Sequence, residues 1–464
     1  MKTTTIVVIL IIYMLGILYI GWRSTKQAQG FDDFLTAGRK GKLHMIIGSY
    51  LGAHLGTGIV IGGAAYGVTH GIGGVWYGLG AAGSYLLFGL VTAKWAYRHK
   101  YLTIPAYLRE RFPATGKAMT VVWALLGSAV GISTICGQII AGRALFTYLG
   151  IDPLIGTLLS VAVVTAYCAA AGMFGVIATD FIQSVIIFIG LIIAIICCFG
   201  GGGLELVQNT LDASHWNFVP FETSTLLLMC LPTAIYGITG GANMQLTASS
   251  DSEKTAFRAP LIACLGVVFI TFIPVLVGMY GATAFPEAEA NTIIFTVILQ
   301  KLPTLIAGLM LAAIVAAVMS TVDTTVMTCV TSLVYDAYGN VIAPAAGHKT
   351  EEKKMRGYAT LMSVIIMALS TALAFLSNDI IGILSSGYTI WVAGGMIPFL
   401  LGRFWKGCNS YGALASMVVG SLFAWLNMAG VTHFVTSLIC LIPAAIAAVV
   451  VSLLTKETTS VSAE

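Results

Sequence analysis

Long apolar stretches recur along the whole chain, and charged residues fall almost only in the segments between them. Most stretches are about 20 residues long, the length that an α-helix needs to cross the hydrocarbon core of a bilayer. They predict thirteen membrane-spanning helices, at residues 5–22, 43–69, 71–96, 118–149, 153–172, 174–200, 222–247, 259–285, 303–335, 356–376, 379–402, 410–429 and 433–454. The first stretch lacks a cleavage site and is expected to be a retained helix. Residues 287–302 are expected to form a short helix outside the membrane.

Two of the predicted helices carry a glycine-rich run near their middle. Residues 52–58 read GAHLGTG, and residues 236–243 read YGITGGAN. Such runs are poor helix formers, and in lipid the freed backbone groups are tolerated only where they bind something or line water. Close helix packing through glycine is the alternative interpretation. Because the runs hold matching positions in the two halves of the chain, we expect both helices to be broken.

The helices between residues 43 and 402 divide into two groups of five, at 43–200 and 222–402. An odd number of spans repeated in tandem must come out inverted, which is the layout of many secondary transporters. One helix, at 5–22, precedes the repeats, and two helices, at 410–454, follow them. The prediction is a single all-α membrane domain over residues 1–464.

Composition and charge agree with a polytopic membrane protein. Apolar residues make up 58% of the chain and charged residues 9%, which excludes an ordinary soluble core. Of the 23 lysines and arginines, 20 fall in alternate loops and the C-terminal tail, which places the N-terminus outside and the C-terminus in the cytoplasm of an inner-membrane protein. The basic residues are too scattered for nucleic-acid binding, and the nine cysteines show no metal-binding spacing.

One predicted helix carries a polar stripe with clear chemistry. Ala317, Ser320, Thr321 and Thr324 lie at i, i+3, i+4 and i+7, and Asp323 is adjacent to this stripe. Hydroxyl and carbonyl oxygens suit a hard cation such as sodium, although serine and threonine can instead bond back to their own helix. An acid at this depth is costly and usually functional, so we favour an ion site.

A second acid, Asp180, lies about two turns into its predicted helix, within residues 175–183. An unpaired carboxylate at this depth would be protonated or would hold a cation. A structural pair with a loop lysine is the alternative.

These residues resemble the sodium:solute symporter family, which includes sodium/proline, sodium/galactose, pantothenate and sialic acid carriers. The resemblance covers nearly the whole chain. The TDFIQ stretch is similar to the family's TDxxQ, and AVMST is similar to its Axx[ST][ST] sodium motif. The matching segments are residues 33–39, 103–108, 111–112, 179–183 and 317–321. The resemblance implies a LeuT-type fold of five plus five helices, which agrees with the count above.

The resemblance implies one sodium ion held by backbone oxygens and two hydroxyls. The implied backbone ligands are Gly52, Leu55 and Ala317, and the implied hydroxyls are those of Ser320 and Thr321. It also implies a possible second cation site at Asp180, with Ser320, Asp323 and Thr324. Here the sequence departs from members that have serine in place of Asp323. This acid can strengthen the cation site, bind a proton or pair with another group.

Family position also suggests residues that contact the solute. They are His54, Thr57, Tyr77, Gln138, Asn243, Gln245 and Tyr388. An imidazolium at His54 would suit a carboxylate, and a neutral ring would suit hydroxyl or amide groups. The expected function is sodium-coupled import of a small polar solute, such as a carboxylate or an amino acid, with sugars and vitamins not excluded.

Two alternatives stay open from the sequence. A transporter of the same fold can couple to protons through His54 and Asp323. A membrane enzyme or receptor can use Asp180 and Asp323 as acid and base, but the chain has no GxSxG, no HExxH and no phosphate-binding loop. We therefore expect a transporter, not an enzyme.

Overall fold

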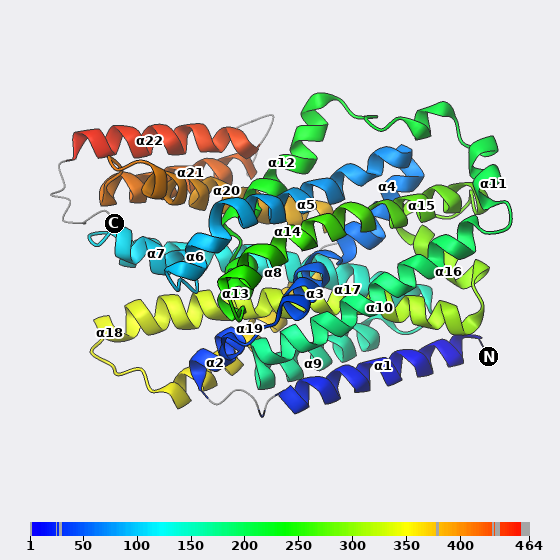
Figure 1. Ribbon diagram of the computed structural model, residues 1–464, viewed down its shortest axis with the longest axis horizontal. Helices are drawn as coiled ribbons and strands as arrows, with labels where there is room; N and C mark the ends of the chain where they lie inside the picture. The colour runs from blue at the N-terminus through cyan, green and yellow to red at the C-terminus, as the bar shows by residue number, and fades with distance from the viewer. Residues whose placement is uncertain are drawn as a thin grey trace.

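A computed structural model describes residues 2–24, 26, 30–376, 380–428, 431 and 437–455. Over these residues the protein is an elongated bundle of helices, and its only β-type contact is a single bridge between Gly41 and Ser250 (Figure 1). The longer helices are α1 (Lys2–Ser24), α3 (Leu43–His54), α4 (Gly63–His70), α5 (Val75–Phe88), α8 (Gly116–Tyr148), α9 (Pro153–Ala171), α10 (Met173–Phe199), α12 (Thr223–Thr239), α13 (Gly241–Ser249), α14 (Glu253–Ile270), α15 (Phe272–Ala284), α17 (Thr304–Val330), α19 (Glu352–Leu376), α20 (Ile380–Phe404), α21 (Ser410–Met428) and α22 (Leu441–Leu454).

Shorter elements cap the two ends of the bundle. One end holds α2 (Phe31–Thr36), α6 (Lys94–Arg98), α7 (Ile104–Arg111) and α18 (Ala343–Ala345), and the other holds α11 (Gly203–Thr210) and α16 (Ile293–Lys301) (Figure 1). The helix expected at 287–302 is present as α16. The chain starts α1 at the end that carries α11 and finishes α22 at the opposite end.

Seven continuous helical segments in the described part of the chain are long and apolar enough to cross a membrane, and three shorter apolar helices accompany them. Two breaks account for part of the difference from the thirteen predicted spans, because they divide the predicted helices at 43–69 and 222–247. The chain leaves the helix after His54, for example, and again at Gly240. The number thirteen therefore stays a prediction.

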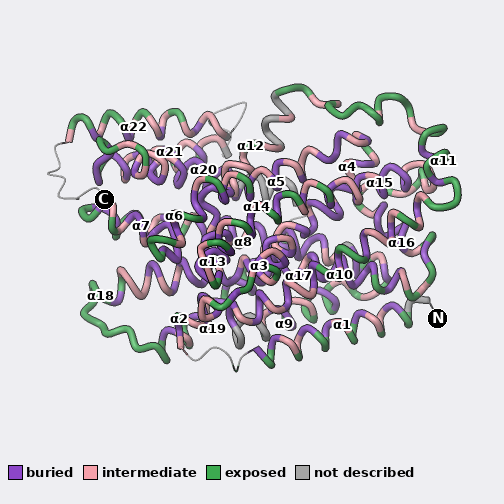
Figure 2. Tube along the Cα trace, viewed as in Figure 1, coloured by how far each residue is buried: buried purple, intermediate pink, exposed green. Residues whose placement is uncertain are grey.

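Helix α17 forms the centre of the bundle. It contacts α1, α3, α8, α10 and α19, and most of its residues are buried (Figure 2). Helix α1, by contrast, has only 28% of the residues in its most apolar stretch buried, and it exposes large side chains such as Leu15 and Tyr19. The polar stripe of α17 therefore lies where water and lipid are excluded.

Both predicted interruptions are present. α3 ends at His54, and the chain resumes as a π-helical turn over Gly58–Gly62. α12 ends at Thr239, and α13 starts after Gly240, whose ψ of 123° is not helical. Glycine also allows close approach at the first break, because a Cβ on Gly56 would lie 2.5 Å from the Thr321 hydroxyl.

Candidate functional site

The hydroxyls of α17 meet the end of α3. Ser320 Oγ donates to the Gly52 carbonyl at 2.8 Å, and Thr321 Oγ1 donates to the Ala53 carbonyl at 3.2 Å. Both hydroxyls also lie near the Ala317 carbonyl, at 3.3 and 3.1 Å respectively. Three carbonyls and two hydroxyls are thus gathered at one point, and all five are the hard oxygens that a sodium ion prefers.

The break in α3 supplies the carbonyls. The last carbonyls of a helix lack partners within the helix and carry the negative end of its dipole. Gly52 lets α10 and α17 approach this point, because a Cβ there would lie 3.3 Å from Ser320 Cβ and 3.4 Å from Asp180 Cβ. The contact with the Ala53 carbonyl was not predicted from the sequence, although carbonyls at a helix end are free to accept hydrogen bonds or to bind a cation. Leu55 is fully buried beside the break, and its role as a ligand stays a prediction.

Two buried acids lie next to these oxygens. Asp180 of α10 and Asp323 of α17 are both 0% exposed and close enough to interact electrostatically. Asp180 Oδ2 accepts hydrogen bonds from Ser49 Oγ and from Thr324 Oγ1, the latter at 3.2 Å. Asp180 Oδ1 is buried with no hydrogen-bond partner among the described residues. Because a buried carboxylate oxygen without a partner is costly, this atom is suited to bind a cation.

Asp323 is held by its own helix and by α10. Its Oδ1 accepts the Thr324 backbone N–H at 2.6 Å, and Thr179 Oγ1 lies 3.5 Å from its Oδ2. The structure therefore brings together Asp180, Asp323 and Thr324, three of the residues of the predicted second cation site.

Helix α1 reaches the same cluster, which the sequence analysis did not foresee. Gln183 Nε2 donates to the Tyr13 hydroxyl at 3.0 Å, and Tyr13 interacts electrostatically with both acids. Gln183 Oε1 is buried with no hydrogen-bond partner among the described residues. Only the folded bundle reveals this contact, because Tyr13 belongs to an apolar helix that carries no motif.

A residue of the first break is also hydrogen-bonded to α8. Gln138 Oε1 accepts the Thr57 backbone N–H at 3.1 Å and would lie 3.1 Å from a Cβ on Gly56. Thr57 is 4% exposed, and its hydroxyl has no hydrogen-bond partner in the described structure. Thr57 and Gln138, two of the predicted solute contacts, therefore lie together beside Thr321.

Tyrosines gather on the other side of the break. The Tyr388 ring lies 4.8 Å from the Tyr236 ring, between centroids, and Tyr388 is also near Tyr77 and Tyr85. A Cβ on Gly58 would lie 2.6 Å from the Tyr77 hydroxyl. Tyr77 and Tyr388 are predicted solute contacts, and Tyr85 and Tyr236 are additions that the structure makes.

The ring of His54 turns toward α5, and α3 stays helical through this residue. Its Nδ1 is hydrogen-bonded to the Tyr85 hydroxyl, and its Nε2 lies 3.3 Å from Ser84 Oγ. The Tyr85 hydroxyl donates to the Tyr50 carbonyl, and Ser84 Oγ donates to the Ala81 carbonyl at 2.7 Å. Since the Tyr85 hydroxyl gives its one proton to the Tyr50 carbonyl, His54 Nδ1 donates to it, whereas Nε2 can accept from Ser84 in a neutral ring or donate to it in an imidazolium.

The two candidates of the second break have mainly structural partners. Asn243 Nδ2 donates to the Gly237 carbonyl at 3.1 Å. Gln245 Nε2 donates to the Leu35 carbonyl at 3.1 Å and to Thr331 Oγ1 at 2.9 Å. Gln245 also borders a separate cavity of about 270 Å³, and its Oε1 has no partner among the described residues.

A comparison with protein families identifies the family of this chain. Residues 34–420 match the model of the sodium:solute symporter family, a range that includes both breaks, both acids and the hydroxyl pair. The chain belongs to the sodium:solute symporter family. This symporter is therefore a transporter and not an enzyme, and the recognition made from its motifs is confirmed.

Individual relatives align with most of this symporter. It is 25% identical to the osmoregulated proline transporter OpuE of Bacillus subtilis (strain 168), over 97% of this chain and 95% of that protein. It is 28% identical to a sodium/pantothenate symporter of Haemophilus influenzae, over 75% and 72% of the two chains. A solved Na⁺-coupled sialic acid symporter superimposes with a TM-score of 0.85 at 20% identity, over 99% of both chains. The fold is thus the LeuT-type fold predicted from the motifs.

Proposed function

We propose that this protein imports a small polar organic solute by coupling it to the inward movement of sodium. The observation that carries the proposal is the contact between the α17 hydroxyls and the end of α3. Ser320 and Thr321 lie against the carbonyls of Gly52 and Ala53, so the oxygens needed for a sodium site are already assembled.

The proposed coupling of ion binding to solute binding depends on which helices supply these oxygens. The hydroxyls belong to α17 and the carbonyls to α3, so an ion bound between them stabilises only conformations in which the two helices stay together. The solute candidates Thr57 and Gln138 lie just beyond the same helix end. An ion that holds α3 against α17 would therefore order the solute site, and each ligand would strengthen the binding of the other.

A second cation site is proposed at Asp180, Asp323 and Thr324. The unpartnered Oδ1 of Asp180 supports it. Two adjacent carboxyls cannot both stay charged without a cation or a proton, so occupation of this site would depend on both ions.

For the solute we favour a carboxylate or an amino acid. An anionic solute would balance an imidazolium at His54, and the contacts of both ring nitrogens are compatible with that charge state. Thr57 offers a buried free hydroxyl, and Tyr77 and Tyr388 offer phenol groups and apolar ring faces. Relatives named for proline and pantothenate also carry solutes with a carboxylate.

The proposed topology has thirteen spans in one domain, residues 1–464. A leading helix at 5–22 precedes inverted repeats at 43–200 and 222–402, and two helices follow at 410–454. The basic segments around α2, α6, α7 and α18 share one end of the bundle (Figure 1), which supports a cytoplasmic assignment for that end. The N-terminus would then be outside and the C-terminus inside the inner membrane.

Uptake into proteoliposomes tests the function. A panel of labelled amino acids and small carboxylates is offered with an inward sodium gradient, an inward proton gradient or neither. We expect accumulation of at least one solute above its equilibrium level with the sodium gradient alone. Accumulation driven only by protons would replace sodium coupling with the proton alternative, and solute binding without any accumulation would favour a receptor.

A further inference from the structure

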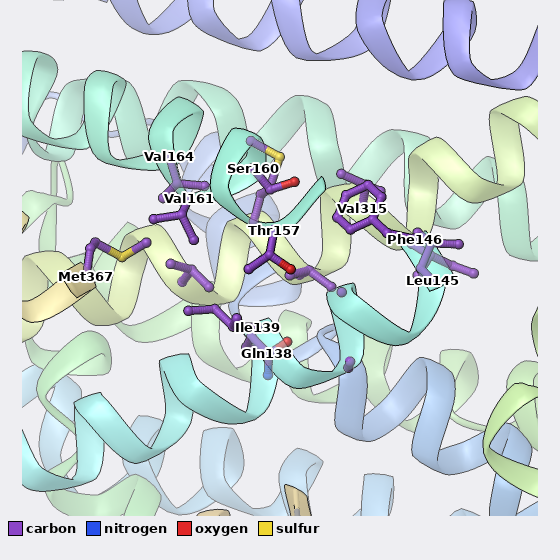
Figure 3. A pocket seen from close by; sticks show the side chains of 16 residues that line it. Gln138, Ile139, Leu145, Phe146, Thr157, Ser160, Val161, Val164, Val315 and Met367 are labelled. Carbon is purple, nitrogen blue, oxygen red and sulfur yellow. The ribbon is translucent and has the colours of Figure 1, made fainter. Parts of the chain in front are cut away.

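A cavity lies between α8, α9, α17 and α19 (Figure 3). It contains about 520 Å³ of empty space, including its open side. Side chains such as Phe146, Val315 and Met367 make the lining apolar, and no charged side chain borders it. The polar exceptions are Gln138 on α8 and two hydroxyls on α9.

Those two hydroxyls depart from the usual behaviour of serine and threonine in a helix. Such side chains normally bond back to their own backbone, as Thr165 Oγ1 does to the Val161 carbonyl at 2.7 Å. Thr157 Oγ1 and Ser160 Oγ instead are buried and have no hydrogen-bond partner among the described residues, and Thr157 is only 3% exposed. Both side chains border the cavity (Figure 3). An apolar space with two unsatisfied hydroxyls is complementary to an apolar molecule with one polar group.

We propose that this cavity binds a small neutral amphiphile, with its apolar body in the space and one hydroxyl or phenol group on Thr157 and Ser160. The absence of charge in the lining disfavours the polar solutes proposed for the transport site. Leu154, Ile155 and Leu158 of the same helix are exposed, so α9 borders the surroundings of the bundle from which a lipid-soluble molecule would come.

A molecule bound in this cavity would act on the proposed ion site through α17, which borders both. Val315, Val318 and Val322 border the cavity from α17, whereas Ser320 and Thr321 face α3 from another side of the same helix. Gln138 links the cavity to the first break through its bond to the Thr57 N–H. A bound molecule would hold α8 against α17 and slow solute uptake. This last clause rests on the proposed function, whereas the binding site does not.

Photolabelling tests binding without any transport. The probe is 4-butylphenol with a diazirine in its alkyl chain, applied to the full chain in nanodiscs, and labelled peptides are located by mass spectrometry. We expect saturable labelling of α8, α9 and α17. Unlabelled 4-butylphenol should compete about fivefold better than 4-butyltoluene, because one neutral hydrogen bond has an effect of this size. Replacing both hydroxyls, by Thr157→Val with Ser160→Ala, should abolish this preference. A preference that persists in the double variant would overturn the proposal.

A steric pair of variants provides the second readout. Gly142 borders the cavity, and a Cβ there would meet only Val318 Cγ1 at 4.0 Å, so Gly142→Leu fills the space. Gly16→Leu is the control, because nothing lies within 4 Å of a Cβ at that exposed site. Labelling should disappear in the first variant and persist in the second, and equal labelling in both would overturn the site. If Gly142→Leu does not fold, the hydroxyl variant decides. Labelling without any slowing of sodium-driven uptake in the wild type would overturn the regulatory clause and leave both the site and the proposed transport function intact.

Discussion

The two broken helices differ in what satisfies their backbone groups. At the first break the partners are side chains of other helices, namely Gln138 of α8 and the hydroxyls of Ser320 and Thr321 of α17. At the second break Asn243 bonds to the Gly237 carbonyl, so one part of the break holds the other.

The scaffold reinforces the second break further. Thr92 Oγ1 donates to the Ile238 carbonyl at 2.7 Å, and Trp391 Nε1 donates to Thr239 Oγ1 at 2.9 Å. The Asn243 amide and the Trp391 indole nitrogens cannot act as cation ligands, although the Thr92 hydroxyl comes from another helical segment, as the hydroxyls at the first break do. The first break differs in that two hydroxyls and three carbonyls meet there beside two buried acids, which supports the proposed ion site at this break.

The acids next to the first break should give the largest effect. Asp180→Asn and Asp323→Asn each remove a charge while keeping the shape of the side chain. We expect Asp180→Asn to abolish sodium-driven accumulation and to leave some solute exchange, because the unpartnered carboxylate oxygen is lost as a cation ligand. Uptake and counterflow over a range of sodium concentrations and pH check this. Normal uptake by both variants would show that neither acid takes part in coupling.

Removing the hydroxyl of Ser320 or Thr321 should give the second-largest effect. Ser320→Ala and Thr321→Ala each remove one oxygen from a dry site, which costs on the order of 1 to 3 kcal/mol. The sodium concentration for half-maximal uptake should rise tenfold or more, with little change in expression. Ser363→Ala is the matched control, because this buried hydroxyl only bonds back to the Ala359 carbonyl. Unchanged sodium dependence in both α17 variants would remove the site.

A substitution at the second break should lower the stability of the protein and leave its affinity for sodium nearly unchanged. Asn243→Ala leaves the Gly237 carbonyl without its amide donor, a loss of about 1 to 3 kcal/mol for a buried group. We expect a lower midpoint of thermal unfolding and a lower maximal rate, with the half-maximal sodium concentration changed less than twofold. A tenfold loss of sodium affinity in this variant would erase the distinction between the two breaks.

The smallest effect concerns His54 and the pH dependence of solute affinity. Imidazole in water loses its proton near pH 6.5. If an imidazolium attracts an anionic solute, affinity is strongest at low pH and weakens severalfold as the ring loses its charge. His54→Gln should flatten this profile without changing sodium affinity. Solute affinity is measured at saturating sodium from pH 5.5 to 8.5, and a flat profile in the wild type would exclude anion pairing.

Much of the architecture could be predicted from residue patterns. Glycine-rich runs at matching places predicted both helix breaks, and the i, i+3, i+4, i+7 spacing predicted that Ser320 and Thr321 share one face. Both inferences need only local chemistry: poor helix formers interrupt a helix, and helical geometry sets which side chains are neighbours.

The partners across the bundle could not be predicted in the same way. Tyr13 and Tyr236 carry no motif and gain their places from helices that are distant in sequence. His54 was predicted from family position to contact the solute, and the structure adds that α3 stays helical through it and that its ring bonds to α5. A shift of one residue in a helix turns a side chain by about 100°, so its partner depends on where the break begins.

By itself, the sequence determined the membrane setting, the family, the places of the two breaks and the stripe of hydroxyls and acids on α17. These properties follow from hydrophobic length, glycine content and helical periodicity, which act within one segment. The tertiary structure alone decided that Asp180 Oδ1 has no hydrogen-bond partner among the described residues and that the Ala53 carbonyl meets Thr321. It also decided that the first break relies on other helices whereas Asn243 bonds within the second. The physical reason is that each of these contacts joins side chains and carbonyls whose distance is set by helix packing, and no pattern within a single helix specifies that distance.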